Sequence, residues 1–173
     1  MNLMNKKIMV AYFSRKGQNY SNGAIVELKQ GNTALAADMI SKAANAELFE
    51  IQTVKGYPFE YNACTVEAKK ELGANSRPEL LADVDVSEYD VIILGYPNWW
   101  GTMPMAVWTF LDNHDFTGKE IMPFCTHEGS GMGNSENDLK KLIPEAYVKN
   151  GLAIHGSSVK DSRDKITEWL QKA

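Results

Sequence analysis

Uninterrupted runs of aliphatic residues predict the strands of a buried sheet. Residues 7–13 and 91–96 contain such runs, in which Val, Ile, Leu and Met stand next to one another. Strands that are covered on both faces have this pattern, as the central strands of a parallel sheet do. Residues 120–126 form a similar run, but Pro123 lies inside it and lacks the amide hydrogen that a ladder of strands uses.

Two shorter strands and five helices complete the predicted elements. Residues 47–53 alternate between apolar and polar side chains, which is typical of a strand with one exposed face. Residues 151–156 are expected to form a short last strand. Apolar positions at helical spacing lie between the strands, in residues 34–44, 61–72, 104–111, 135–142 and 162–171.

Strand and helix alternate five times along the chain, which predicts an α/β fold with a parallel sheet and helices on both faces. The 173 residues suit a single domain, residues 1–173, and no repeat or linker divides them. One connection is unusual: residues 15–30, from Arg15 to Gln30, are about twice as long as the usual link between a strand and its helix. Residues 24–28 are expected to be extended, and the polar residues before them to form turns.

Composition and charge argue against several classes of protein. The chain is 44% hydrophobic and 23% charged, as soluble globular proteins are. The net charge of −4 and the lack of a basic run argue against a nucleic-acid partner. No apolar stretch approaches the roughly 20 residues that span a bilayer, so no membrane association is expected. No secretory signal precedes the first strand, and Cys64 and Cys125 form no pair motif, which together favour a cytoplasmic protein.

A phosphate-binding site is predicted between the first strand and its helix. Ser14 ends the strand, and Gly31, Asn32 and Thr33 open the helix. The first amides of a helix have no partner within it, and the helix dipole is positive at that end. With two hydroxyl groups and one side-chain amide beside them, they can bind a phosphate without a formal cation. The alternative is an ordinary N-cap, formed by Asn32 or Thr33.

Two further loops are expected at the same end of the sheet. The loop after the third strand contains two adjacent tryptophans, although loops normally avoid large apolar rings. Ligands of open α/β sheets bind beyond the carboxyl ends of the strands, which favours a pocket over a plugged core. The loop after the fourth strand is rich in glycine, which lets backbone amides approach a ligand closely. The residues of these loops are Pro97, Asn98, Trp99, Trp100, Gly101, Thr126, His127, Glu128, Gly129, Ser130 and Gly131.

A phosphate site, an aromatic wall and a glycine-rich loop together describe a site for a flat heterocycle with a phosphorylated tail. Over nearly its whole length the chain resembles the flavodoxin family. The resemblance rests on Tyr12-Phe13-Ser14 with Gly31-Asn32-Thr33, and on the segments 95–104 and 124–131.

The insertion at residues 15–30 departs from the phosphate loop of that family, in which Gly-Asn-Thr follows the strand almost directly. The segments 95–104 and 124–131 are similar to those of bacterial flavodoxin-like proteins that have this same insertion. Gly17-Gln18-Asn19 is a competing match to the phosphate loop, ranked second because no helix follows it.

The resemblance implies a flavodoxin-like three-layer sandwich with a five-stranded parallel sheet in the order 2-1-3-4-5. It implies FMN as the cofactor and electron transfer as the function, with redox partner proteins or small-molecule electron acceptors as partners. Ser14, Asn32 and Thr33 would then hold the phosphate, and Trp99 or Trp100 would stack on the isoalloxazine ring. The insertion is expected to help close the site.

An FMN-dependent NAD(P)H:quinone or related reductase on the same fold is the alternative, because fold does not separate a carrier from an enzyme. A response-regulator receiver would need acidic residues after the first strand and an Asp at the end of the third, where this chain has Ser14 and Gly95-Tyr96-Pro97. A binding protein that keeps the fold without a flavin is a further alternative. No catalytic residue and no metal ligand are assigned, and both cysteines are expected to be inert, packed thiols.

Overall fold

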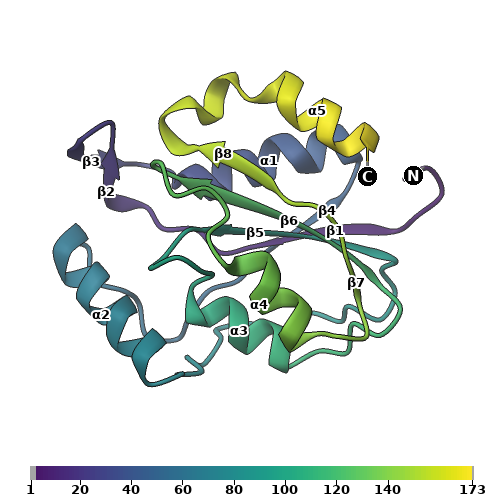
Figure 1. The fold of residues 1–173 in the computed structure, drawn as a ribbon, viewed down its shortest axis with the longest axis horizontal. Helices are drawn as coiled ribbons and strands as arrows, with labels where there is room; N and C mark the ends of the chain where they lie inside the picture. The colour runs from purple at the N-terminus through teal and green to yellow at the C-terminus, as the bar shows by residue number, and fades with distance from the viewer. Residues whose placement is uncertain (1–2, 173) are drawn as a thin grey trace.

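The computed structural model describes residues 3–172 and has a parallel sheet as its middle layer (Figure 1). The strands follow the order β4-β1-β5-β6, and both β7 and β8 pair with the remaining side of β6. This arrangement confirms the predicted order 2-1-3-4-5, with β7 and β8 sharing the fifth position. The strands are β1 (Ile8–Tyr12), β4 (Glu47–Glu50), β5 (Val91–Pro97), β6 (Glu120–His127), β7 (Tyr147–Val148) and β8 (Leu152–His155).

Helices cover both faces of the sheet. The helices α1 (Asn32–Ala44) and α5 (Arg163–Lys172) lie on one face, and α3 (Met105–Asp112) and α4 (Ser135–Leu142) lie on the other (Figure 1). The helix α2 (Tyr61–Gly73) lies beside α3, and the 3₁₀ helix η1 (Gly156–Asp161) follows β8. Within residues 3–172, no helix is both long enough and apolar enough to cross a bilayer.

Alternate residues of the central strands enter two separate hydrophobic cores. Val10 and Ile93 belong to the core beneath α1 and α5, whereas Ala11 and Leu94 belong to the core beneath α3. All four side chains are 0% exposed. A strand with a core on each face needs apolar residues at every position, so the uninterrupted aliphatic runs predicted these strands correctly.

Two short strands, β7 and β8, share the fifth strand position, and the break between them lies opposite Pro123. β7 pairs with Glu120 and Ile121 of β6, and β8 begins to pair at Phe124. Proline has no amide hydrogen to donate to a neighbouring strand, so the edge pairing is interrupted where Pro123 faces it. The sequence predicted only the second of these two pieces.

The insertion between β1 and α1 is a β-hairpin of β2 (Gly17–Ser21) and β3 (Ala24–Leu28). Asn22 and Gly23 form its turn with φ values of 48° and 83°. A two-residue Asn-Gly turn with positive φ at both positions matches the twist of antiparallel strands, so this dipeptide is a strong hairpin signal. The extended segment 24–28 was predicted correctly, but the expectation of turns at residues 17–21 was wrong because pairing with β3 overrides their turn propensity.

Candidate functional site

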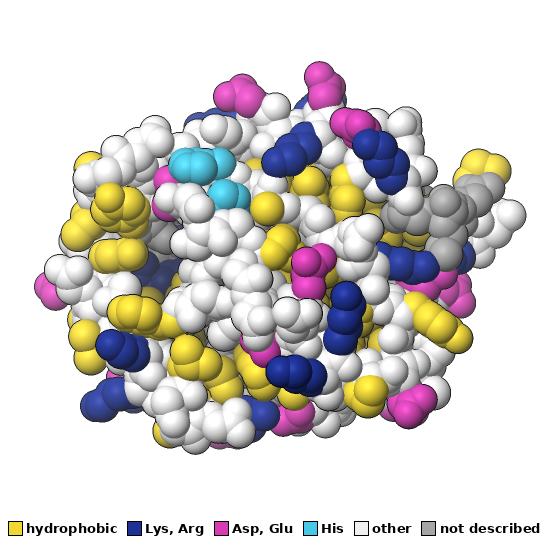
Figure 2. All heavy atoms as spheres, viewed as in Figure 1, with side chains coloured by type: hydrophobic (Ala, Val, Ile, Leu, Met, Phe, Trp, Pro, Cys, Tyr) yellow, Lys and Arg dark blue, Asp and Glu magenta, His cyan; other side chains and the backbone are white. Residues whose placement is uncertain are grey.

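A cavity of about 600 Å³ lies at the carboxyl ends of β1, β5 and β6. Figure 2 shows a hollow toward the left of this face, with histidine and apolar side chains around it. All three predicted loops contribute to the lining, as expected for ligand sites of open α/β sheets. The predicted residues in the lining are Ser14, Asn32, Thr33, Asn98, Trp99, Trp100, Gly101, Thr126, His127, Glu128 and Ser130.

Four predicted residues, Gly31, Pro97, Gly129 and Gly131, lie next to the cavity in sequence but outside its lining. The lining also includes residues that were not among the predicted cofactor-binding residues, although Arg15 begins the insertion that was expected to help close the site. They come from the β2–β3 hairpin, from α2 and from the start of η1. These residues are Arg15, Asn19, Tyr20, Tyr61, Cys64, Thr65, Ala68 and Gly156.

Ser14 caps the first turn of α1 from outside the helix. Its Oγ accepts a hydrogen bond from the Ala34 amide at 3.0 Å, and the N-cap position itself is Gly31. The expectation that Asn32 or Thr33 is the N-cap was therefore wrong, because both lie inside the first turn. Since the Ser14 hydroxyl accepts with its oxygen, its hydrogen can still be donated to a ligand.

The first and third loops are joined by two buried threonine hydroxyls. Oγ1 of Thr33 and Oγ1 of Thr126 lie 2.7 Å apart, at hydrogen-bonding distance. Thr33 is 2% exposed and Thr126 is 4% exposed, and both residues belong to the lining of the cavity. A satisfied polar pair in a buried position fixes the start of α1 against the end of β6.

The tryptophan loop contains a tight two-residue turn. Trp99 and Thr102 exchange both backbone hydrogen bonds, at 2.9 and 3.3 Å. Trp100 and Gly101 between them have φ values of 55° and 83°. A non-glycine residue with positive φ is uncommon, so the loop holds Trp100 in a backbone conformation that its own side chain disfavours.

The side chain of Asn98 holds this turn against the third loop. Its Oδ1 accepts from the Gly101 amide at 2.9 Å, and its Nδ2 donates to the Gly131 carbonyl at 3.0 Å. The backbone amide of Asn98 donates to the Thr126 carbonyl at 2.9 Å. Asn98 therefore connects the two loops that carry the aromatic and glycine-rich parts of the site.

The two tryptophans have different surroundings. The Trp99 ring packs edge to face against Phe13 and Tyr57, with centroids 5.1 and 5.0 Å apart. Trp100 is 51% exposed, and its Nε1 donates to the Thr65 carbonyl of α2 at 2.9 Å. Trp99 is thus part of an aromatic cluster, whereas Trp100 bridges the cavity wall to α2.

The hairpin is fastened to the beginning of α2. The Arg15 guanidinium donates to the carbonyls of Pro58 and Phe59, at 2.7 and 2.6 Å, and also to that of Gln18. Gln18 Oε1 accepts from the Tyr61 amide at 3.1 Å, which satisfies one of the free amides at the start of that helix. The hairpin and α2 therefore form one continuous wall of the cavity.

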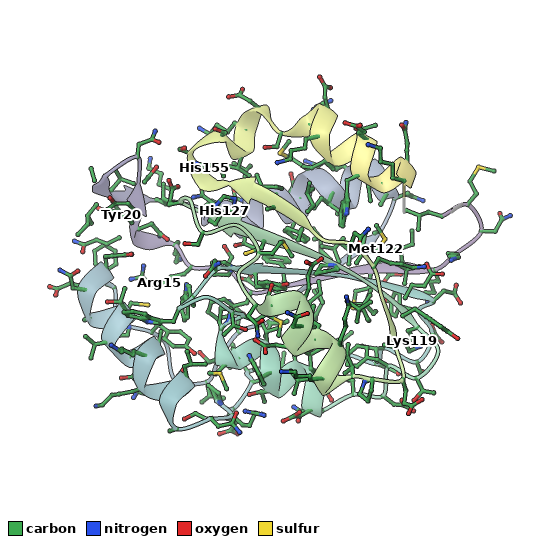
Figure 3. All side chains as sticks on the ribbon, viewed as in Figure 1. Arg15, Tyr20, Lys119, Met122, His127 and His155 are labelled. Carbon is green, nitrogen blue, oxygen red and sulfur yellow. The ribbon has the colours of Figure 1, made fainter. Side chains whose placement is uncertain are left out.

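His127 and His155 lie side by side at the carboxyl ends of β6 and β8 (Figure 3). Their ring centroids are 5.5 Å apart. His127 Nδ1 accepts a hydrogen bond from the Gly129 amide at 2.9 Å. Burial lowers the pKa of His127, and the positive charges of His155 and Lys165 lower it further. His127 is therefore neutral over most of the physiological pH range.

Cys125 lies at the end of β6 but is 1% exposed. Burial raises the pKa of its thiol to about 12. Because the thiolate is the nucleophilic form, this cysteine contributes to packing and is not expected to react as a nucleophile. Burial also raises the pKa of Cys64, although that residue borders the cavity from α2.

Several solved structures that resemble this chain are named flavodoxins or flavoproteins. A protein from Bacteroides eggerthii that is provisionally named a flavoprotein shares 30% identity and a TM-score of 0.72, over 94% of this chain and 98% of that one. A Lactobacillus acidophilus flavoprotein in complex with FMN shares 22% identity and a TM-score of 0.66, over 90% and 97%. Oxidised flavodoxin 2 from Bacillus cereus shares 21% identity and a TM-score of 0.52, over 96% and 99%. A comparison with curated proteins found no match.

The sequence model of the family described as Flavodoxin matches residues 7–173. This match spans the whole α/β sandwich, from β1 to the end of α5. It supports FMN as the cofactor, as the resemblance of the three loops predicted. The chain belongs to the flavodoxin family.

Proposed function

We propose that this protein binds FMN in the cavity and transfers electrons as a flavodoxin-type carrier. The observation that carries the proposal is the convergence of three loops on one cavity with two chemically different ends. One end has hydroxyl and amide donors at the start of α1, and the other has tryptophan rings. FMN has the matching pair of parts, a phosphorylated tail and a planar ring system.

The groups at the phosphate end of the cavity are suited to bind an anion. Ser14, Asn32 and Thr33 present polar side chains beside the first turn of α1, whose amides carry a partial positive charge. A Cβ atom on Gly31 would come within 2.2 Å of Ser14 Oγ, so only glycine leaves the hydroxyl in place. These residues would bind the phosphate and orient the rest of the ligand.

The ring end fits a planar heterocycle. Trp99 and Trp100 line the cavity on one side, and Tyr61 lines it from α2. Aromatic contacts contribute about 1 kcal/mol each beyond the area they bury, and they also keep water out. Bound FMN would supply reversible electron transfer, and the chain would supply the aromatic walls that hold the ring.

An apolar surrounding lowers the tendency of a bound flavin to accept electrons. The lining contains one carboxylate, Glu128, and one guanidinium, Arg15, so the surroundings of the ring are set mainly by the tryptophan and tyrosine side chains. Because these side chains exclude water and disfavour added negative charge, the reduction potential is expected to lie below that of free FMN.

A reductase on the same scaffold is the second candidate. Tyr20 of the hairpin and Tyr61 of α2 add aromatic surface to the cavity beyond the three loops, with ring centroids 6.1 Å apart. Such a surface favours a second planar reactant above the flavin, as a quinone reductase needs.

Stepwise anaerobic reduction of the FMN-loaded protein, followed by visible absorption, tests the carrier against the reductase. A carrier is expected to take up its two electrons in two separate one-electron steps. Reduction in a single two-electron step, together with turnover of NADH or NADPH and a quinone, would contradict the carrier and support the reductase.

A further inference from the structure

Two further aromatic rings pack against Trp99. Trp99 lines the cavity, whereas Phe13 and Tyr57 contact it without being part of the lining. The Tyr57 ring stands nearly perpendicular to the Trp99 ring, at 85°, and to the Phe13 ring, at 89°, with centroids 5.0 and 5.7 Å away. Edge-to-face contacts have a preferred geometry, so the position of the Trp99 ring depends on where these two rings are held.

Phe13 and Tyr57 differ in how firmly packing holds them. Phe13 is 4% exposed and belongs to the core beneath α3. Tyr57 is half-buried and borders a second cavity, of about 380 Å³, between the loop 53–57, α2 and the loop 76–79. A ring with open space beside it lacks packing contacts on that side, so packing alone does not fix Tyr57.

The hydroxyl of Tyr57 supplies a second constraint. It donates a hydrogen bond to Glu71 Oε2 of α2 at 2.7 Å. Burial raises the pKa of this hydroxyl, and the hydrogen bond to Glu71 raises it further, so the hydroxyl keeps its proton at physiological pH. Hydrogen bonds to an ionised carboxylate are stronger than those between neutral groups. Tyr57 is thereby tied to α2.

Both tryptophans of the cavity are connected to α2. This helix lies at the side of the molecule, next to the hairpin (Figure 1), and it contributes to the cavity lining between Tyr61 and Ala68. Trp100 is connected directly, through the hydrogen bond from its Nε1 to the Thr65 carbonyl. Trp99 is connected only indirectly, through the ring of Tyr57 and its bond to α2.

We propose that Tyr57 and Glu71 are positioning residues of the flavin site, and that their hydrogen bond holds the Trp99 ring in place for contact with the isoalloxazine. This inference rests on the proposed function. Neither residue lines the cavity that would hold FMN, so both act through Trp99. Without the hydrogen bond, Tyr57 can move toward the second cavity, and the Trp99 ring loses support on that side.

The test uses substitutions that break or keep this one hydrogen bond. Tyr57→Phe keeps the ring and removes the donor. Glu71→Ala removes the acceptor, whereas Glu71→Gln keeps an oxygen that can accept. The matched control is Glu67→Ala, one turn earlier on α2. The Glu67 carboxylate borders the same second cavity but pairs with Lys55 at 3.2 Å.

The affinities for FMN and for riboflavin, which lacks the phosphate, are measured by titrating flavin fluorescence. Tyr57→Phe and Glu71→Ala should each raise the Kd of FMN by about threefold to tenfold, the effect of one hydrogen bond. The Kd of riboflavin should rise by the same factor, because the ring and not the phosphate loses a contact. The double variant should bind no more weakly than the single ones, since both remove the same bond. Glu71→Gln and Glu67→Ala should stay within about twofold of the wild type.

A Trp99→Leu background separates positioning from a general structural effect. This background has no ring for Tyr57 to hold, so adding Tyr57→Phe should change the FMN Kd by less than about twofold. A residue that only stabilised the fold would weaken binding equally in both backgrounds. Near-UV circular dichroism of the flavin-free protein is a second measurement. Glu71→Ala removes no ring but should alter the aromatic signal, and Glu67→Ala should leave it unchanged.

Three results would each overturn the inference. The first is wild-type FMN affinity in Tyr57→Phe, and the second is a loss in Glu67→Ala as large as that in Glu71→Ala, which would mean that only the charge of α2 matters. The third is an undiminished effect of Tyr57→Phe in the Trp99→Leu background. If the wild type binds neither FMN nor riboflavin, the proposed function fails and the inference fails with it. Binding of FMN by the wild type together with any of the three results would remove the inference alone.

Discussion

The hydroxyl of Ser14 occupies the position that a side chain on Gly31 would need. A Cβ atom at residue 31 would lie 2.2 Å from Ser14 Oγ and 2.7 Å from the Arg15 carbonyl oxygen. The φ of residue 31 is −65°, so the requirement for glycine comes from space and not from backbone conformation. This close approach brings the end of β1 against the first turn of α1 and forms the phosphate end of the cavity.

Gly31→Ala should damage both stability and binding. The added methyl group must push the Ser14 hydroxyl away from the Ala34 amide, which it caps at 3.0 Å. We expect a loss of about 1–3 kcal/mol in the free energy of unfolding, measured by urea denaturation, and weaker FMN binding. Gly56→Ala is the control, because a Cβ atom there meets nothing within 4 Å. Equal stability and equal FMN affinity in the two variants would contradict the steric contact between residue 31 and the Ser14 hydroxyl.

Replacing residues 15–30 by a two-residue link should weaken FMN binding and leave the sheet intact. The hairpin supplies Arg15, Asn19 and Tyr20 to the cavity lining, and it fastens the start of α2 through Gln18. Without it, one wall of the cavity is lost and α2 is less constrained. FMN titration measures the change in affinity, and far-UV circular dichroism checks that the variant is folded. An unchanged affinity in a folded variant would show that the hairpin does not close the site.

Replacement of either tryptophan should weaken FMN binding, but only replacement of Trp99 should lower the free energy of unfolding markedly. Trp99→Ala removes a ring that packs against Phe13 and Tyr57, and should cost about 2 kcal/mol or more. Trp100→Gly removes an exposed ring and places glycine at a φ of 55°, so the unfolding free energy should change by less than about 1 kcal/mol. Both variants should bind FMN more weakly. A fully stable Trp99→Ala variant would contradict the packed position of Trp99. A strongly destabilised Trp100→Gly variant would contradict the exposed position of Trp100.

The cysteines should be unreactive in the folded protein. The pKa of Cys125 is raised to about 12, and that of Cys64 is raised as well. Above the usual pKa of a thiol the unfolded chain gains thiolate, whereas the folded chain stays protonated until the pH approaches the raised value. A thiol reagent at about pH 8 should therefore label both residues rapidly in urea and slowly without it. FMN should slow Cys64 further, because Cys64 borders the cavity. Rapid labelling of Cys125 in the native protein would be the opposite result.

The sheet was predictable from sequence because burial determines its pattern. β1, β5 and β6 each face two cores, so their uninterrupted apolar runs have one structural explanation. β7 is only two residues long and exists through pairing with β6, which no local pattern indicates. The hairpin was half predicted, since β3 has an apolar pattern whereas β2 is polar. The Asn22-Gly23 pair was the signal that would have identified it.

The loops of the site were predictable, but the wall opposite them was not. Strand ends of a parallel sheet meet at one edge, so the residues after β1, β5 and β6 had to lie together. The position of α2 depends on tertiary contacts of Arg15 and Gln18, which no spacing in the sequence reveals. Helix capping was misjudged for a similar reason, because Ser14 caps α1 from the end of β1.

The most direct test of the central claim is whether the purified protein retains FMN. The protein is mixed with FMN, desalted, and examined by visible absorption, with the Gly31→Ala variant treated in parallel. We expect the wild type to keep about one FMN per chain and the variant to keep clearly less. A wild-type protein that emerges colourless would contradict the assignment of the three loops to FMN, and only the fold would stand.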